Sequence, residues 1–246
     1  MSPAELMSHS DAQLPPPVIH IDDFVPGARA ARGLTVIIDV FRAFSVAAYA
    51  FAAGVRSIIP LASVEQARAL KQQHPDYLLV GERFAKPLPG FDHGNSPTEL
   101  QGRALHGRTL LHTTHSGTQG LVQAAAAQEV ITGALVNAAA IVRYIRARRC
   151  AEVTLVRMGQ HATERCVEDD LCAEILAARL RGDDYDVGGV RERLRAAPSA
   201  AKFFDPACTW APATDFELCA QLDRFDFVLR LDRDVSPCEL RMVPVA

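Results

Sequence analysis

The feature that most constrains the fold is a short apolar run at residues 34–39, LTVIID, which ends in an acidic residue. A run of this kind, without polar alternation, is typical of a strand that is buried on both faces of a parallel sheet. An alanine-rich helix is predicted directly after it, at 44–53, and Gly54 follows as the stop. A buried strand followed at once by a helix indicates an α/β fold.

The same alternation continues along the chain. Further strands are predicted at 56–61, 77–80, 109–113, 129–132, 152–157 and 225–231. Further helices are predicted at 63–73, 118–127, 137–148, 166–181 and 214–222. Ser63 and Gln66 form a capping box at the start of the first of these. The rhythm predicts a mostly parallel or mixed sheet with flanking helices on both faces.

Three regions are expected along the chain. Residues 1–17 are polar and proline-containing, which indicates a flexible N-terminal arm. The remainder is expected to divide near residue 130 into an N-terminal α/β lobe, 18–130, and a C-terminal α/β lobe, 131–246. Composition does not mark this boundary.

Charge and cysteine usage limit the class of protein. The net charge is −3, from 26 basic and 29 acidic residues, which argues against a nucleic-acid-binding surface. No apolar signal core and no membrane-length apolar stretch is visible. The six cysteines show neither C-x-x-C nor zinc spacing. We therefore expect reduced thiols in a cytoplasmic protein.

A polar loop at residues 84–97 is too charged and too rich in proline and glycine to serve packing alone. It follows the apolar run that leads to Glu82 and Arg83, and it contains Asn95 and Ser96. Ligands of open α/β sheets bind outside the carboxyl ends of the strands. The loop therefore indicates part of an active site.

Polar residues also follow the other predicted strands. They are Asp39 and Arg42 after the first, residues 113–118 (TTHSGT) after the fourth, Asn137 after the fifth, and Glu168 to Asp170 after the sixth. If these strands are parallel, all of these residues meet at one edge of the sheet. Their convergence is stronger evidence than any one motif.

Several of these residues also have a purely structural explanation. Asp39 is in a position to cap the helix after it, and acids in the first turn of a helix, such as Glu168 and Asp169, are stabilised by the helix dipole. Arg42 opposes that dipole, so a bound anion is its expected partner. The segment TTHSGT suits either a phosphate at a helix N-terminus or an ordinary Ser/Thr cap.

Carboxylates beside hydroxyl and arginine groups suit a hard divalent cation that bridges to a phosphate. The haloacid-dehalogenase type of phosphatase requires a second aspartate two residues after the first, and Phe41 stands there instead. A P-loop motif is absent, which argues against a P-loop nucleotidase.

These residues resemble the 2-phosphosulfolactate phosphatase family, the magnesium-dependent phosphatases of coenzyme M biosynthesis. The matching segments are IIDVFRAFS (37–45), VGER (80–83), GFDHGNSP (90–97), TTHSGT (113–118), the G-x-x-x-N at 133–137, EDDLCA (168–173) and TDFELCAQLDRFDFV (214–228). The resemblance implies two lobes with magnesium and substrate in the cleft between them. Two positions depart from the family pattern: Ser116 replaces an asparagine, and Glu174 replaces a glycine.

The resulting hypothesis is a Mg²⁺-dependent hydrolase of a small anionic phosphomonoester. Asp39, Glu82 and Asp169 are the expected metal ligands, and Glu168 is a second carboxylate or general base. Asp39 is alternatively the nucleophile. The remaining expected substrate-binding residues are Arg42, Arg83, Asn95, Ser96, Thr114, Ser116, Gly117, Thr118 and Asn137.

A second hypothesis is a non-catalytic protein that senses an anionic metabolite in the same pocket. In either case the expected partner is a small phosphorylated acid rather than a nucleic acid or a membrane. A homodimer is compatible with a compact α/β protein of this size.

Overall fold

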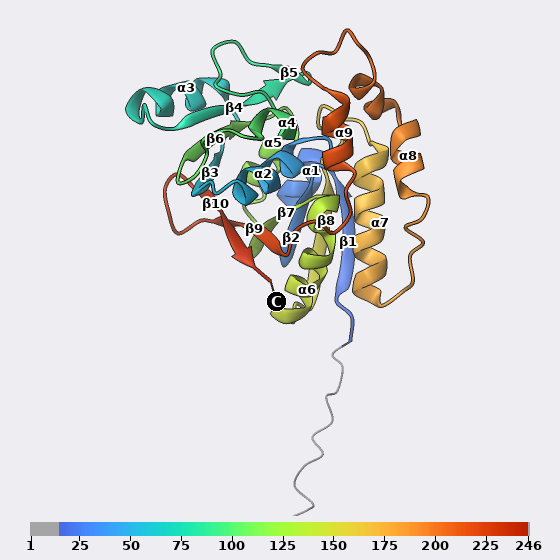
Figure 1. Ribbon diagram of the computed structural model, residues 1–246. Coiled ribbons are helices and arrows are strands. Elements are labelled where there is room, and N and C mark those ends of the chain that lie inside the picture. Colours follow the sequence, from blue (N-terminus) through green and yellow to red (C-terminus); the bar gives the residue numbers. More distant parts are fainter. Residues whose placement is uncertain (1–14, 246) are drawn as a thin grey trace, which may run out of the picture.

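The computed structural model describes residues 15–245, so the expected flexible arm at 1–17 lies almost wholly outside the described residues. The chain runs through alternating strands and helices (Figure 1), with two short 3₁₀ helices, η2 and η3. In chain order the elements are β1 (Val18–Asp23), α1 (Phe24–Ala30), β2 (Leu34–Ile38), α2 (Ala43–Ala52), β3 (Ser57–Pro60), α3 (Val64–Gln73), β4 (Leu78–Arg83), β5 (Lys86–Pro87), α4 (Pro97–Leu100), β6 (Thr109–Thr113), α5 (Gly117–Gln123), β7 (Glu129–Gly133), η2 (Leu135–Asn137), α6 (Ala138–Arg148), β8 (Glu152–Arg157), α7 (Val167–Arg181), α8 (Val190–Ala196), η3 (Pro198–Phe203), α9 (Ala213–Cys219), β9 (Phe227–Asp232) and β10 (Glu239–Pro244).

Helices cover both faces of the sheet, as the apolar runs predicted. All five residues of β2 are buried. Val36 and Ile38 belong to the core cluster that α6 and α7 complete, whereas Ile37 belongs to the cluster formed with α2 and α5. Figure 1 shows α7 and α8 side by side along one flank, with α3 at the opposite end of the molecule. The predicted α/β fold with flanking helices is confirmed.

Most predicted elements match the structure, and the misses are short or half-exposed. The Ser63 side chain accepts the Gln66 N–H at 3.2 Å, so this helix starts where the capping box placed it. The elements that the sequence did not predict are β1, α1, β5, α4, α8, β10 and the two 3₁₀ helices η2 and η3. β1 lies at the sheet edge and pairs only with β8, and half of its residues are exposed. Such strands lack the continuous apolar signal of a central strand.

The sheet contains two groups of parallel strands. One sheet runs in the order β1-β8-β2-β7-β9-β10-β3-β6-β4-β5. β1, β8, β2 and β7 are parallel to one another, and so are β3, β6 and β4. The antiparallel hairpin β9-β10 joins the groups through single residue pairs, Ile131 with Arg230 and Leu240 with Ile58. Between β7 and β3 the strand direction reverses three times, so the two groups of parallel strands point in opposite directions.

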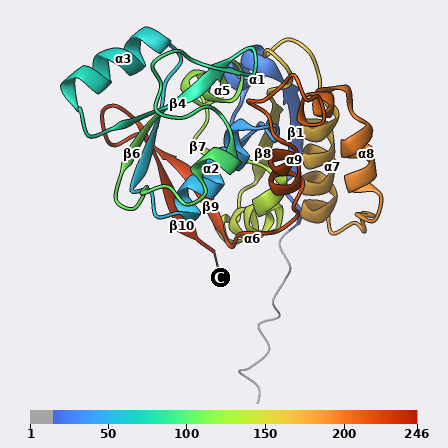
Figure 2. The same cartoon turned by 45° about the horizontal axis from the view of Figure 1, so that its top comes forward.

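This arrangement corrects the expectation that one parallel edge collects all the strand ends. In a flat sheet the carboxyl ends of β2 and β4 would lie at opposite edges. Twist changes this, because neighbouring strands rotate by roughly 20–25°. The six steps from β2 to β4 therefore turn the strand direction by about 120–150°. A reversal combined with that rotation brings the two carboxyl ends to the same side of the sheet. Figure 2 shows the fold with its top turned toward the viewer.

The sheet is continuous, and strands from both expected lobes are interleaved in it. β2 lies between β7 and β8 although it precedes them by many residues in the chain. The division near residue 130 stays a prediction. All six cysteines are unpaired. Within residues 15–245, none of the helices combines the length and the apolar character that crossing a bilayer requires.

Candidate active site

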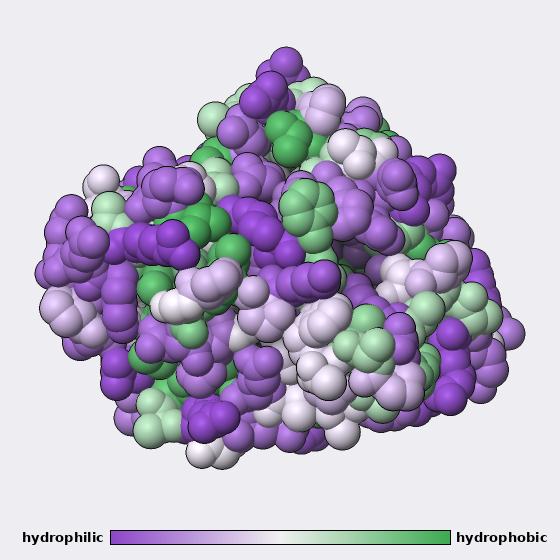
Figure 3. All heavy atoms as spheres, turned by 90° about the horizontal axis from the view of Figure 1, so that it is seen from above, coloured by the Kyte–Doolittle hydropathy of each residue, from purple (hydrophilic) through white to green (hydrophobic). Residues whose placement is uncertain are grey.

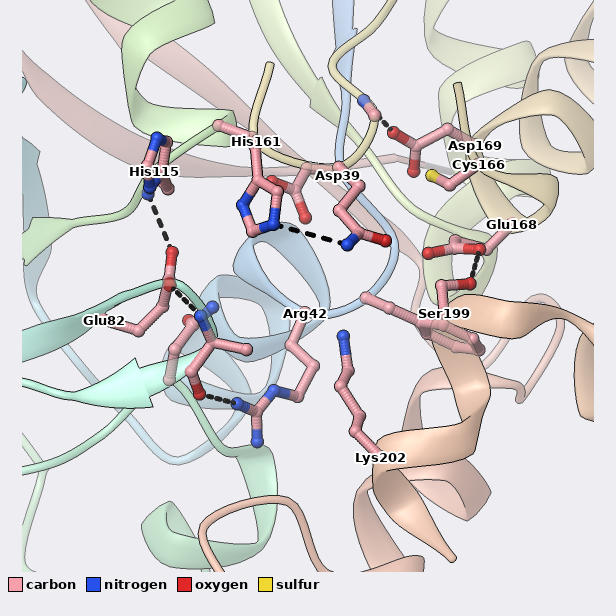
Figure 4. A pocket seen from close by; sticks show the side chains of 16 residues that line it. Asp39, Arg42, Glu82, His115, His161, Cys166, Glu168, Asp169, Ser199 and Lys202 are labelled. Carbon is pink, nitrogen blue, oxygen red and sulfur yellow. Dashed lines mark hydrogen bonds between the residues drawn. The ribbon is translucent and has the colours of Figure 1, made fainter. Parts of the chain in front are cut away.

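A polar pocket lies where the two groups of strand ends meet. Seen from above, the surface is largely hydrophilic, with a hollow near its centre (Figure 3). The pocket is lined by Asp39, Phe41, Arg42, Glu82, Ala85, Asn95, His115, Ser116, Gly159, Gln160, His161, Cys166, Glu168, Asp169, Ser199 and Lys202 (Figure 4). Four carboxylates therefore share a small space, which is costly unless cations compensate them.

Asp39 follows β2 and lies at the centre of the carboxylates in Figure 4. Its Oδ1 accepts the Ala43 N–H at 3.1 Å, so it does cap α2, yet it also lines the pocket. Burial raises the pKa of Asp39 from 3.8 to about 7. The hydrogen bond from Ala43 lowers this pKa, whereas the charge of the nearby Glu82 raises it further. A carboxyl group with a pKa close to neutral in a pocket is a candidate for chemistry.

Asp169 and Glu168 begin α7, where the helix dipole favours acids. Asp169 accepts the Val40 N–H at 2.9 Å and the Gly159 N–H at 2.8 Å, so it joins the loops after β2 and β8. Burial raises its pKa well above the ordinary value, with Asp39 and Glu168 as further causes. Burial is the largest cause of both raised pKa values, and the charge of Asp39 adds to the rise at Asp169, which indicates a site suited to a cation.

Glu82 lies within β4 rather than beyond its end. The strand continues to Arg83 because β5 pairs with it, Glu82 opposite Pro87. The Glu82 carboxylate accepts two backbone N–H groups, from Ala85 and from His115, each at 2.7 Å. It therefore ties the loop after β4 to the loop after β6, a structural role that the sequence did not suggest.

Arg42 lines the pocket, but its guanidinium is engaged by the protein. Nη1 donates to Asp215 Oδ2 at 2.6 Å and to the Trp210 carbonyl at 2.8 Å, and Nη2 donates to the Ala85 carbonyl at 3.1 Å. The expectation that a ligand anion would be its main partner is therefore corrected. A buried arginine needs a carboxylate, and α9 supplies it.

Arg83 and the threonines of TTHSGT do not line the pocket. Arg83 donates to the Thr113 hydroxyl at 2.9 Å and to the Ala62 carbonyl at 3.2 Å, since successive side chains of a strand point to opposite faces. Thr114 and Thr118 bond to each other's backbone N–H groups, at 3.1 Å and 2.9 Å. These hydroxyls form a cap, so the capping explanation holds for them.

Of the remaining expected residues, some line the pocket and others lie outside it. Asn95 lines the pocket and lies 3.2 Å from His112 Nε2. Ser116 also lines it, and its hydroxyl accepts the Ala162 N–H at 2.9 Å. Ser96 instead donates to Asp215 at 2.7 Å. Asn137 lies away from the pocket and donates to the Phe227 carbonyl at 3.3 Å.

Gly117 supports the pocket through its lack of a side chain. A Cβ at this position would lie 2.8 Å from Asp39 Oδ2 and 3.0 Å from the Ala43 Cβ. The start of α5 therefore packs directly against Asp39, as a bare backbone. Glu174, the other departure from the family pattern, is exposed and accepts a hydrogen bond from Tyr185, so its charge faces solvent.

Sequence reasoning missed several pocket residues, among them Ser199, Lys202, His161 and Cys166. Ser199 and Lys202 come from η3, His161 from the loop after β8, and Cys166 from the start of α7. Ser199 donates to Glu168 Oε2 at 2.6 Å. None of these residues belongs to a recognisable motif, and η3 lies in the irregular region where periodicity gave no signal.

The loops on either side of the pocket hold residues in the left-handed backbone region. Phe84 and Ala85 have φ of 54° and 63°, and His161 and Ala162 both have φ of 56°. The Phe84 and His161 rings face each other with centroids 5.4 Å apart. Non-glycine residues in this region cost free energy and gather at functional sites. This clustering is a further indication that the pocket is functional.

The carboxylates of the pocket are the kind of ligand that magnesium prefers, although the described residues form no preformed metal-binding cluster. Across residues 15–245, no three His, Cys, Asp or Glu side chains are gathered closely enough to hold a metal ion. Asp39, Glu82 and Asp169 line one pocket but do not form such a triad. Mg²⁺ usually takes only one or two protein carboxylates, with substrate oxygens and water as its other ligands. The neighbouring Asp39 and Asp169 meet that requirement.

Comparison with known proteins identifies the family. A family model described as 2-phosphosulpholactate phosphatase matches residues 19–234. The chain belongs to this family. Its 2-phosphosulfolactate phosphatase motifs contribute Asp39, Glu82, Asn95, Ser116, Glu168 and Asp169 to the pocket.

Curated relatives carry the same name. A "Probable 2-phosphosulfolactate phosphatase" of Bacillus subtilis is 28% identical over 207 residues, which cover 83% of this chain and 90% of the relative. One of Symbiobacterium thermophilum is 35% identical over 164 residues, covering 66% and 70%. One of Thermotoga maritima is 30% identical over 205 residues, covering 78% and 86%. The similarity thus extends over most of both chains.

Proposed function

We propose that this protein is a magnesium-dependent phosphatase that hydrolyses 2-phosphosulfolactate or a related small phosphorylated hydroxy acid. The observation that carries the proposal is one pocket in which four family-motif carboxylates, Asp39, Glu82, Glu168 and Asp169, face a lysine. Membership of the family across residues 19–234 supports the choice of substrate class.

The magnesium ion is part of the proposal. Asp39 and Asp169 would hold it, because their buried carboxyl groups repel each other and have raised pKa values. Bound there, Mg²⁺ would neutralise phosphate charge and lower the pKa of a bound water. Glu82 is proposed as a third ligand; both of its oxygens accept backbone N–H groups, as both oxygens of Asp169 also do.

The protein's own residues suit the hydrolysis of a phosphate ester. Glu168 accepts a hydrogen bond from Ser199 and is almost fully buried, so it is fixed in orientation and suited to take a proton from the attacking water. Asp39 serves either as a magnesium ligand or as a nucleophile that forms an aspartyl-phosphate. Both roles require it to be ionised.

A phosphate-release assay tests the proposal. Purified protein is incubated with 2-phosphosulfolactate and with other phosphorylated hydroxy acids, in magnesium and again after chelation. Magnesium-dependent release of inorganic phosphate is expected, strongest with substrates that carry further acidic groups. No release, combined with substrate-induced thermal stabilisation, would favour the anion-sensing protein instead.

Four finer expectations accompany the proposal. The substrate is a small anion rather than a nucleic acid, because the pocket is narrow and rich in carboxylates. A role in coenzyme M biosynthesis and a cytoplasmic location follow the family resemblance and stay predictions. A homodimer also stays a prediction, which light scattering of the purified protein would test.

A further inference from the structure

Lys202 is a pocket residue that no motif of the sequence indicates. It lies in η3, the short 3₁₀ helix Pro198–Phe203, and its ammonium group points into the centre of the pocket (Figure 4). Buried aromatic contacts hold η3 in place. The Phe203 ring meets the Phe41 ring edge-on with centroids 5.1 Å apart. The position of Lys202 is therefore set by packing against the segment that carries Asp39.

The two cations of the pocket differ in what they bind. Arg42 forms a buried ion pair with Asp215 and donates to two backbone carbonyls. Burial and the charge of Arg42 lower the pKa of Lys202, and Glu168, Asp39 and Glu82 offset part of that drop, so acids lie on several sides of it. Within residues 15–245, however, no carboxylate is close enough to form an ion pair or a hydrogen bond with its ammonium group.

The Lys202 ammonium lies 5.1 Å from the centroid of the Phe203 ring, its one aromatic contact among the described residues. An ammonium carries three N–H donors, and within residues 15–245 no protein oxygen accepts a hydrogen bond from this one. The nearby carboxylates attract the ammonium toward the space between them but do not reach it. That space is also where a phosphate between Asp39 and Glu168 would place its oxygens. An anion bound there would supply the missing acceptors.

We propose that Lys202 binds the phosphoryl oxygens of the substrate, and that Arg42 instead holds the pocket wall. The inference rests on the proposed function only for the identity of the anion as a phosphate ester. It assigns the anion contact to η3, a segment far along the chain from the motifs. A point charge on a flexible stem is suited to phosphate.

Phosphate binding by three variants tests the inference. Inorganic phosphate is titrated by calorimetry, with magnesium present, into wild type, Lys202→Met, Lys202→Arg and Lys86→Met. Lys86 is a matched control because it is an exposed lysine on β5, outside the pocket, and its ammonium faces Trp210. Lys202→Met is expected to weaken phosphate binding by about 10- to 100-fold, the loss of one charge-assisted hydrogen bond.

The other variants are expected to bind phosphate more normally. Lys202→Arg keeps the charge and should lose less than about tenfold, and Lys86→Met should match wild type. If Lys202→Met unfolds, Lys202→Gln takes its place. The phosphate-induced rise in unfolding temperature provides a second readout, since a merely structural role would lower the baseline temperature but leave that rise intact.

The outcomes separate this inference from the proposed function. A folded Lys202→Met variant that binds phosphate as tightly as wild type overturns the inference, whether or not the wild type is a phosphatase. Lys202-dependent phosphate binding without hydrolysis of any ester supports the inference and removes the proposed function. A wild type that neither binds phosphate nor releases it refutes both.

Discussion

The Arg42 guanidinium donates to Asp215 Oδ2 at 2.6 Å, and the two side chains are only 2% and 0% exposed. Asp215 also accepts the Ser96 hydroxyl at 2.7 Å and the Thr98 N–H at 3.0 Å. One carboxylate thus joins the segment after β2, the polar loop before α4, and α9. Three of the family's motif segments meet at a residue buried beside the pocket.

Asp215→Asn is expected to destabilise the fold by about 3 kcal/mol, because it leaves the Arg42 charge buried without a partner. Urea unfolding measures the free energy. Glu217→Gln on the same helix is the control. Its ion pair with Arg191 is half-exposed, so a change below about 1 kcal/mol is expected. Equal stability of Asp215→Asn and wild type would mean that the buried ion pair contributes nothing.

Asp39→Asn is expected to lower phosphate release by more than about 100-fold while the fold is kept. The amide oxygen still accepts the Ala43 N–H, and removal of a buried charge beside Glu82 should leave the unfolding temperature unchanged or higher. Turnover at the wild-type rate would leave capping as the only role of Asp39.

The same variant separates the two chemical roles of Asp39. If Asp39 is a metal ligand, titration of Mg²⁺ by calorimetry should show weakened binding in Asp39→Asn. If it is the nucleophile, Mg²⁺ binding should persist, and acid quenching of the wild type during turnover should trap an acyl-phosphate. Normal magnesium binding without any trapped intermediate would argue against both.

Gly117→Ala is expected to destabilise the protein by about 1–3 kcal/mol and to reduce activity, because the new Cβ would press on Asp39 Oδ2 at 2.8 Å. Gly189→Ala is the matched control, since a Cβ there meets no atom within 4 Å. Thermal unfolding and phosphate release are measured on both. An active, stable Gly117→Ala variant would show that α5 can move away from Asp39.

The contribution of His112 to stability is expected to be lost as the pH is lowered from about 6.5 toward 4, whereas the raised pKa values of Asp39 and Asp169 act in the opposite sense. Burial lowers the pKa of His112 from 6.5 to about 4, so the unfolded chain binds a proton in this range that the folded protein does not. The contribution of His112 to stability is fully present above its pKa in the unfolded chain, 6.5. It is lost as the pH falls toward the pKa in the folded protein, about 4, and it amounts to at most about 3 kcal/mol. Relative to wild type, His112→Gln should show a less positive slope of unfolding free energy against pH in this range. An unchanged slope would assign it to other groups.

Local sequence was enough to predict most strands, most helices and the acids of the pocket. Strand β2 follows from an apolar run, the start of α3 from Ser63 and Gln66, and the family from motifs that contain Asp39, Asn95 and Glu168. These signals depend only on neighbouring residues, on periodicity and on caps. They can therefore be recognised without knowing which segments of the chain contact one another in the fold.

Tertiary structure decided which of these residues share the pocket and what each one binds. Arg42 finds its carboxylate 173 residues away, Glu82 is engaged by the loop that holds His115, and Lys202 enters from a helix without a motif. The twist of the sheet, not a common parallel edge, brings the ends of β2 and β4 together. Long-range packing and the cost of a buried, unpaired charge set these partnerships, and neither leaves a local pattern in the sequence.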